Sequence, residues 1–303
     1  MALEFAIPDV VARRAALRGA EGEIWLDALP ALVVRLTEEW NLRPDRVMDG
    51  GTEALVLSVK TAANQPAILK IAPPGEAFQR QLSVLIAASA ECCPAVLAHE
   101  AASGTVLLEA LGDALAASGE PINTQLGVLC DLLAKLWKRP PPPGLPTGAD
   151  KARQLISLIE DNGSRQGRPV PDETLQAALA AAGRRASAFD PTTAVLGHGD
   201  AHAWNALKGL GGYRLIDPEG YLIEPAYDLG VCLREWPEAY LAGDPLALGR
   251  ARCRWLAART GVDAGAIWDW GLIESVTSGL ALLALGLEED GRRHLAVARS
   301  WAA

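Results

Sequence analysis

Apolar and polar positions alternate in distinct ways along the first third of the chain. Trp and aliphatic residues recur at helical spacing over residues 25–40, which predicts an amphipathic helix. Short apolar runs at residues 54–59 and 67–71, separated by a turn, predict a β-hairpin. Helical spacing returns over residues 76–88, and an apolar run at residues 105–109 predicts another strand. Together these elements indicate a small α+β unit.

The remainder of the chain follows a mostly helical pattern. Residues 125–137, 149–161 and 172–187 have helical spacing, and a proline cluster ends the first of them. A compact β segment is expected over residues 194–216, and the residues from 227 onwards predict a bundle rich in Trp, Ala and Leu. The pattern changes at Gly112.

This change predicts two domains, an N-terminal one at residues 1–111 and a C-terminal one at residues 112–303. The expected fold class is α+β, with strands concentrated in the first domain and helices in the second.

Composition narrows the range of partners. The net charge of −9 argues against a nucleic-acid partner, because phosphate binding requires clustered Lys and Arg. The five cysteines show no metal-ligand spacing and are expected to be reduced thiols. The longest apolar run is too short to span a bilayer and the first residues do not form a secretory signal, so we expect no membrane partner and a cytoplasmic location.

The clearest chemical signal is the segment 198–205, His-Gly-Asp-Ala-His-Ala-Trp-Asn, followed after a predicted hairpin by Asp217. Phosphoryl transfer requires a carboxylate to orient and deprotonate a hydroxyl, here Asp200. It also requires oxygen ligands for magnesium, for which Asn205 and Asp217 are the candidates. The spacing of these residues therefore predicts a kinase.

A second interpretation treats His198, His202 and Asp200 as ligands of a metallohydrolase. No third histidine lies nearby in the sequence, since only His99 and His294 remain. A lone Asp in a loop is also often a turn residue. We favour the kinase because all the spacings of the motif agree with it at once.

The motif H-G-D-x-H-x-x-N, followed by a strand and Ile-Asp-Pro, resembles the aminoglycoside phosphotransferases. The similarity is greatest to the branch with streptomycin 6-kinases and hydroxyurea phosphotransferases, and it extends over nearly the whole chain. This resemblance implies a bilobal protein-kinase-like fold, with a small lobe built on an antiparallel sheet and a larger, mostly helical lobe. It implies ATP and Mg²⁺ as cofactors.

The resemblance also implies roles for individual residues. Asp200 matches the family's catalytic base, and Asn205 and Asp217 match its magnesium ligands. Asp228 matches an acid that braces the catalytic loop, which is a structural role. Lys70, in an apolar run at the end of a strand, matches the lysine that binds the nucleotide phosphates.

Other nucleotide contacts are expected from position. Backbone N–H groups of a glycine-bearing turn are expected to cover the phosphates, at Gly50, Gly51 and Thr52. The hinge that meets the adenine is expected at Glu109, Ala110 and Leu111.

The partner of Lys70 is open. Where the family has a glutamate this chain has Gln81, so either Gln81 or Glu76 is expected to orient the lysine.

Acceptor recognition is expected from the helical domain. Four carboxylates lie beside Trp or within apolar stretches and are candidates for binding a cationic acceptor: Glu235, Glu238, Asp269 and Glu274. The competing interpretation pairs these acids with Arg234, Arg250, Arg252 and Arg254.

The expected function is ATP-dependent phosphorylation of a hydroxyl on a small molecule, with an aminoglycoside such as streptomycin as the acceptor that the resemblance implies. One alternative is a metabolic kinase for an amino alcohol, sugar or nucleoside. The other is a nucleotide-binding protein without catalysis, which Gln81 favours. The oligomeric state stays open.

Overall fold

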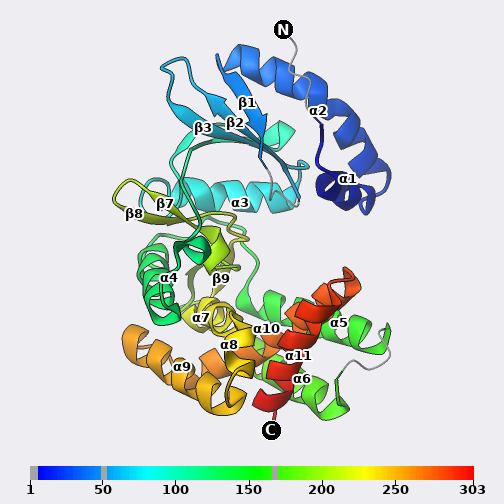
Figure 1. Ribbon diagram of the computed structural model, residues 1–303, viewed down its shortest axis with the longest axis vertical. Coiled ribbons are helices and arrows are strands. Elements are labelled where there is room, and N and C mark those ends of the chain that lie inside the picture. Colours follow the sequence, from blue (N-terminus) through cyan, green and yellow to red (C-terminus); the bar gives the residue numbers. More distant parts are fainter. Residues whose placement is uncertain (1–5, 49–52, 166–169) are drawn as a thin grey trace. The chain divides into compact units, whose positions relative to one another are not determined.

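A computed structural model describes residues 6–48, 53–165 and 170–303 (Figure 1). The chain forms two compact units. The first comprises Met1–Asp113 and Leu207–Ile216, and the second comprises Ala114–Ala206 and Asp217–Ala303. This grouping differs from the expected division at residues 111 and 112, because the chain returns to the first unit after several helices of the second.

Backbone hydrogen bonds explain that return. The segment 207–216 contains most of a two-stranded hairpin, β7 (Ala206–Gly209) and β8 (Gly212–Leu215). Gly112 N–H donates to the carbonyl of Lys208 at 2.7 Å, and Leu215 N–H donates to the carbonyl of Cys92 at 2.7 Å. Non-local bonds of this kind leave no periodic signal in the sequence.

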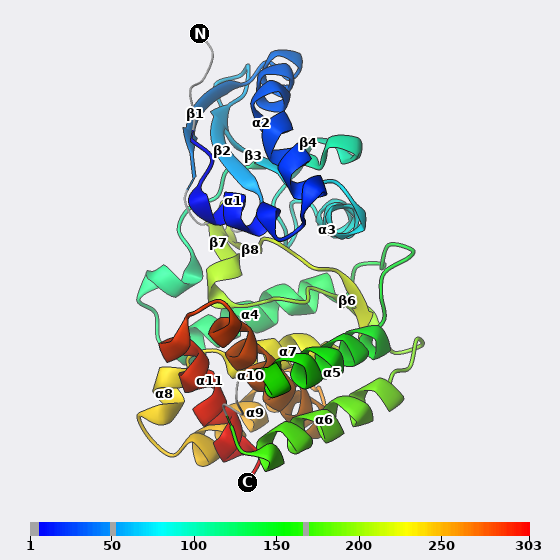
Figure 2. The ribbon, with the colours of Figure 1, turned by 90° about the vertical axis from the view of Figure 1, so that its right-hand side faces the viewer.

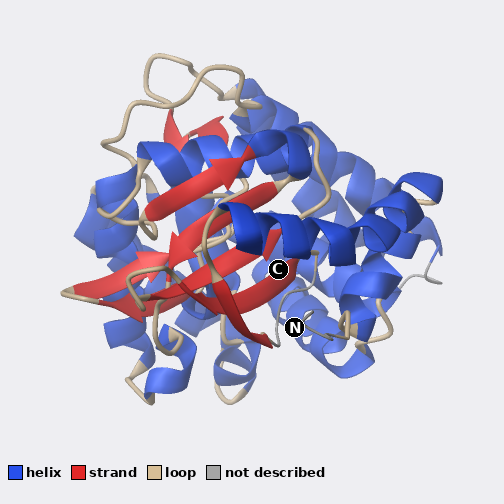
Figure 3. Ribbon diagram, turned by 90° about the horizontal axis from the view of Figure 1, so that it is seen from above, coloured by secondary structure: helices blue, strands red, loops and turns tan. Residues whose placement is uncertain are grey.

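The first unit is built on a five-stranded sheet of order β1-β2-β3-β5-β4, in which every neighbouring pair is antiparallel. Figure 3 shows its strands in red. The predicted strands are present, and two edge strands add to them. Neither edge strand has the apolar alternation that reveals a half-buried strand; β1, for example, reads Arg-Pro-Asp-Arg-Val. The strands are β1 (Arg43–Val47), β2 (Leu55–Lys60), β3 (Pro66–Ile71), β4 (Val96–Glu100) and β5 (Thr105–Glu109).

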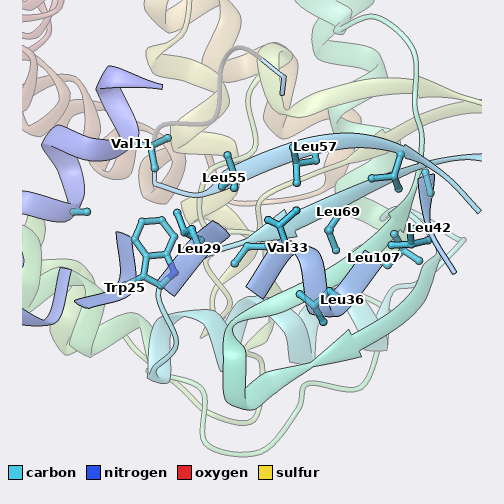
Figure 4. Packing of buried hydrophobic residues seen from close by; sticks show 14 residues of the cluster. Val11, Trp25, Leu29, Val33, Leu36, Leu42, Leu55, Leu57, Leu69 and Leu107 are labelled. Atoms are coloured by element: carbon cyan, nitrogen blue, oxygen red, sulfur yellow. The ribbon is translucent and has the colours of Figure 1, made fainter. Parts of the chain in front are cut away.

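Two N-terminal helices cover one face of this sheet. Leu29, Val33 and Leu36 of α2 pack in one buried cluster with Leu57 and Leu69 of the strands (Figure 4). Each such side chain contributes about 1.5–3 kcal/mol when removed from water. The helices of this unit are α1 (Asp9–Ala16), α2 (Ala20–Glu39) and α3 (Glu76–Ala87).

The second unit is mostly helical, as predicted. Its centre is α10, which buries residues on all sides and packs against α5, α6, α7, α9 and α11. α7 approaches α10 so closely that a Cβ on Gly230 would lie 2.4 Å from Trp270 Cβ. α5 and α6 lie side by side (Figure 2). The helices are α4 (Ile122–Leu136), α5 (Gly148–Arg165), α6 (Asp172–Ser187), α7 (Pro225–Arg234), α8 (Pro237–Leu241), α9 (Pro245–Thr260), α10 (Ala264–Ala284) and α11 (Glu288–Trp301).

No helix within the described ranges combines the length and the apolar character that crossing a membrane requires.

Candidate active site

A short pair of strands in the second unit brings two loops together. β6 (Val195–Gly197) pairs antiparallel with β9 (Tyr221–Ile223). The loop that follows β6 and the segment that precedes β9 therefore meet at one end of the pair. Glu219 N–H donates to the carbonyl of His198 at 2.8 Å and fastens the two segments to each other. The loop carrying Asp200 and Asn205 thus lies beside the segment carrying Asp217.

Asp228 stabilises the loop that follows β6 through hydrogen bonds to the loop backbone. It is 0% exposed, and its carboxylate accepts hydrogen bonds from the backbone N–H groups of His198, at 3.1 Å, and Gly199, at 2.9 Å. Trp137 Nε1 donates a third, at 2.9 Å. The structure confirms the structural role predicted for Asp228.

Gly199 permits the loop to turn. Its φ of +94° lies in a region that residues with a side chain rarely adopt. A Cβ at this position would also lie 2.8 Å from Glu219 Cβ. The glycine of the motif is therefore required by both the backbone conformation and the approach of the neighbouring segment.

The carboxylate of Asp200 is held from several directions. Arg234 Nη2 donates to Oδ1 at 2.8 Å, and Asn205 Nδ2 donates to Oδ2 at 3.2 Å. His202 Nε2 lies 3.3 Å from the same Oδ2. Burial alone would raise the pKa of Asp200, but the hydrogen bond from His202 and the charge of Arg234 outweigh it and hold the pKa well below its ordinary value. Asp200 is therefore an oriented, ionised carboxylate at neutral pH.

The pKa values of the two histidines of the motif shift in opposite directions. Burial tends to lower the pKa of His202, yet its hydrogen bond to Asp200 raises the pKa above the ordinary value. His198 is fully buried, its Nδ1 accepts from Asp200 N–H at 3.2 Å, and burial lowers its pKa. His198 therefore shapes the loop. Within the described ranges, no group of three or more His, Cys, Asp or Glu is arranged to hold a metal ion.

Asn205 and Asp217 suit a magnesium ion chemically. The Asn205 amide donates through Nδ2 to both the backbone carbonyl of Asp200, at 3.0 Å, and its carboxylate, which directs Oδ1 away from that residue. Asp217 is exposed and takes a φ of +57°, a conformation that Asp adopts more readily than most residues. An amide oxygen and a carboxylate are the hard ligands that Mg²⁺ prefers.

Arg234 connects Asp200 to a buried acid on α10. Its Nη1 donates to Glu274 Oε2, and Glu274 is 3% exposed. The Tyr227 hydroxyl donates to Glu274 Oε1 at 2.8 Å and lies 3.2 Å from the carbonyl oxygen of Gly199. Sequence reasoning named Arg234 only as a possible surface partner. Its contact with Asp200 spans 34 positions, which no local pattern reveals.

The four predicted acceptor carboxylates lie in different settings. Glu274 is engaged by Arg234 and Tyr227, as described. Asp269, 8% exposed, receives Arg184 Nη2 at 2.5 Å and Arg185 Nε at 3.1 Å. Arginines of the helical unit thus neutralise both acids. Arg184 and Arg185 were not among the arginines that the sequence suggested as partners, whereas Arg234 was.

The other two acids are placed differently. Glu235 Oε1 lies 3.8 Å from Arg234 Nε, and burial raises the pKa of Glu235 against the opposing charge of His202. Glu238, at the start of α8, is exposed. The structure therefore brings Glu235 close to the loop of Asp200 and leaves Glu238 open to solvent.

The predicted nucleotide-binding residues lie in the first unit. Lys70 is a half-buried residue of β3, directly between Val56 of β2 and Val106 of β5 in the register. Because side chains alternate along a strand, it lies on the face opposite that of Leu69 and the α2 cluster. Gln81 is half-buried within α3 and Glu76 is exposed at its first turn, so the partner of Lys70 stays a prediction.

The remaining nucleotide contacts stay predictions as well. Glu109 ends β5, where its N–H donates to the carbonyl of Ala95 at 2.9 Å and its Oε1 accepts from Ala95 N–H at 3.0 Å. Ala110 and Leu111 continue without regular secondary structure. The turn of Gly50, Gly51 and Thr52 lies outside the described residues.

Comparison with known proteins decides the family. The profile of the aminoglycoside/hydroxyurea antibiotic resistance kinases matches residues 39–286. The chain belongs to this family. It is accordingly a phosphotransferase that acts on hydroxyl groups of small molecules, and the predicted resemblance is confirmed.

Individual relatives agree with this assignment. The chain is 30% identical to the streptomycin 6-kinase of Streptomyces griseus over 287 residues, which cover 94% of this chain and 92% of that one. It is 29% identical to the hydroxyurea phosphotransferase of Kitasatospora aureofaciens over 215 residues, 70% of this chain and 62% of the relative.

Solved structures confirm the predicted protein-kinase-like α+β fold. The choline kinase LicA from Streptococcus pneumoniae matches with a TM-score of 0.61 at 14% identity, over 90% of this chain and 99% of that one. Aminoglycoside phosphotransferase APH(4)-Ia, solved with AMP-PNP and hygromycin B, matches with a TM-score of 0.59 at 16% identity, over 88% and 97% of the two chains.

Proposed function

We propose that this kinase transfers the γ-phosphate of ATP, with Mg²⁺, to a hydroxyl of a cationic small molecule of the aminoglycoside class, with streptomycin as the leading acceptor. The observation that carries the proposal is the arrangement around Asp200, an ionised carboxylate held by Arg234 and Asn205 beside the Asp217 segment. The extended similarity to a streptomycin 6-kinase supports the acceptor class. AMP-PNP in the related fold supports a nucleotide donor.

Asp200 receives and orients the acceptor hydroxyl. The hydroxyl is expected to donate to the Asp200 carboxylate, whose Oδ1 also accepts from Arg234 and whose Oδ2 also accepts from Asn205. Its oxygen then forms a bond to the γ-phosphorus as the bond to the β–γ bridging oxygen breaks and ADP leaves, and its proton passes to Asp200. The low pKa of Asp200 makes it a weak base, so orientation is its larger contribution.

Asn205 and Asp217 would hold the metal through their side-chain oxygens. A bound Mg²⁺ neutralises charge on the phosphates, which lowers the cost of bringing an oxygen nucleophile to them. The chain supplies the positions of these ligands, through the hydrogen bonds of the loop and the fastening of Glu219 to His198. Lys70 would bind the phosphates of ATP, with Glu109, Ala110 and Leu111 at the adenine.

The acceptor's cations would bind acids near the Asp200 loop that no arginine of the described residues contacts closely; Glu235 has one long ion pair, at 3.8 Å to Arg234. Glu238 is exposed, and Glu235 is a neighbour of His202, which itself contacts Asp200. We therefore propose Glu235 and Glu238 as the acceptor contacts. Asp269 and Glu274 are assigned to the scaffold because their carboxylates are already paired.

The test is ADP release from Mg-ATP against a panel of acceptors. The panel contains streptomycin, other aminoglycosides, hydroxyurea, amino alcohols, sugars and nucleosides. We expect an aminoglycoside to stimulate release, and Asp200→Asn to abolish the stimulation. Asp131→Asn is the matched control, because Asp131 is an exposed acid that pairs with Arg259 at 2.7 Å.

Other outcomes favour the other two functions. Stimulation by an amino alcohol, sugar or nucleoside alone would replace the proposed acceptor with a metabolic one. Binding of Mg-ATP without turnover on any acceptor would favour a nucleotide-binding protein without catalysis.

A further inference from the structure

A buried lysine on α5 reaches the segment that carries Asp217. Lys151 is 7% exposed, and its Nζ donates to Glu219 Oε2 at 2.9 Å across 68 positions of sequence. The ammonium also lies over the rings of Tyr221, 5.0 Å from the centroid, and Tyr227, at 5.5 Å. An ammonium is costly to bury, and this one is compensated by a carboxylate and two aromatic faces.

Glu219 transmits that contact to the loop. Its backbone N–H donates to the carbonyl of His198 at 2.8 Å, and Gly220 N–H approaches the same oxygen at 3.3 Å. The side chain of Glu219 is 44% exposed, so water could hydrate this carboxylate without the buried lysine. Asp217 precedes Glu219 by two residues and has a positive φ of +57°.

Stability alone is a poor explanation for the pair. Replacing a buried ion pair by apolar groups of similar volume is often neutral or stabilising. A chain that needed only a filled interior at this position would therefore be served equally well by an apolar side chain. An apolar side chain could not, however, fix the position of the 217–220 segment. The hydrogen bond from Lys151 is directional and joins that segment to α5.

We propose that Lys151 is a positioning residue that, through Glu219, holds the Asp217 carboxylate where magnesium binds. The inference rests on the proposed function, which makes Asp217 a metal ligand. Residues that orient a metal's ligands typically change metal affinity by about 10- to 100-fold when removed. Lys151 contacts neither substrate nor phosphate in this assignment.

The experiment measures binding of Mn²⁺, as a probe for Mg²⁺, to the complex of the protein with AMP-PNP by electron paramagnetic resonance. Lys151→Met replaces the ammonium with an apolar side chain of similar length. We expect its Mn²⁺ dissociation constant to rise about tenfold while the thermal unfolding temperature changes little, because the Glu219 side chain left behind is 44% exposed and can be hydrated. Arg153→Met is the control: it lies on the same helix and removes an exposed pair with Asp150, so neither quantity should change.

Two further variants complete the test. Glu219→Gln should weaken Mn²⁺ binding similarly, and adding Lys151→Met to it should weaken binding no further, because both act through one contact. Wild-type Mn²⁺ affinity in Lys151→Met, or an increase confined to the KM of the acceptor, would overturn the inference.

The variant Asp217→Asn distinguishes an error in the role of Lys151 from an error in the metal site. If Asp217→Asn loses Mn²⁺ and Lys151→Met retains it, only the role of Lys151 is wrong. If Asp217→Asn itself binds Mn²⁺ as the wild type does, the metal assignment of the proposed function is wrong and the inference falls with it.

Discussion

The guanidinium of Arg234 donates to Oδ1 of Asp200 at 2.8 Å and links that residue to the interior of the helical unit. The same guanidinium donates to the buried Glu274. Asp200 is therefore oriented by a contact that originates on α7 and is itself anchored on α10.

Replacing Asp200 by Asn should lower kcat by about 10²- to 10⁴-fold, because the neutral amide loses the charged contact with Arg234 that orients it and cannot accept the hydroxyl proton. Folding should persist, since Arg234 keeps its bond to Glu274. Steady-state turnover with the acceptor identified by the panel measures the first effect, and circular dichroism the second. Turnover close to that of the wild type would remove Asp200 from the mechanism.

Replacing Arg234 by Met should lower the free energy of unfolding by about 3–5 kcal/mol, because Glu274 then keeps a buried charge without its cation. Turnover should fall as well, since Asp200 loses the donor to Oδ1. Urea denaturation provides the measurement. Arg254→Met, at an exposed position of α9, is the control and should change stability by no more than about 0.5 kcal/mol. Equal stability of the two variants would contradict the role of Arg234.

Replacing Asp228 by Asn should destabilise the loop that holds Asp200. The carboxylate accepts from three donors, and an amide would place its NH₂ group against one or more of them. An unsatisfied buried donor costs about 1–3 kcal/mol. We expect a lower unfolding midpoint together with a reduced kcat. A variant with full activity and unchanged stability would show that the brace is dispensable.

Stability should depend on pH through His294 of α11. Burial, reinforced by the positive charge of Arg234 and opposed by Asp290, lowers the pKa of His294 to about 4 from an ordinary 6.5. Between these values the unfolded chain binds a proton that the folded chain does not. The free energy of unfolding should therefore fall as the pH drops from about 6.5 to about 4, by at most about 3 kcal/mol from this group.

His294→Leu isolates that contribution. The variant lacks the titrating group, so the difference in unfolding free energy between wild type and variant should change across this window and level off above it. Denaturant unfolding at several pH values gives the difference directly. Parallel pH profiles for the two proteins would mean that His294 titrates equally in both states.

Much of the fold was predictable because its signals are local. The helix at α2 and the strands β2 and β3 follow from apolar spacing, since each buries one face against the same cluster. The edge strands β1 and β4 were missed, because an edge strand pairs through its backbone and its side chains need not alternate. The hairpin 207–216 was predicted as β structure, but not its return to the first unit.

The amino-acid sequence alone was enough to predict the chemistry proposed for the loop. Asp200, Asn205 and Asp217 stand at short, fixed separations, and the order of residue types along one loop is enough to indicate phosphoryl transfer. The surroundings of these residues became apparent in the folded chain alone, where Arg234 contacts Asp200 and Glu274 contacts Arg234. The pairing of Lys151 with Glu219 likewise joins residues 68 positions apart. Such contacts depend on how helices pack, and helix packing brings together side chains whose sequence separation carries no periodic signal.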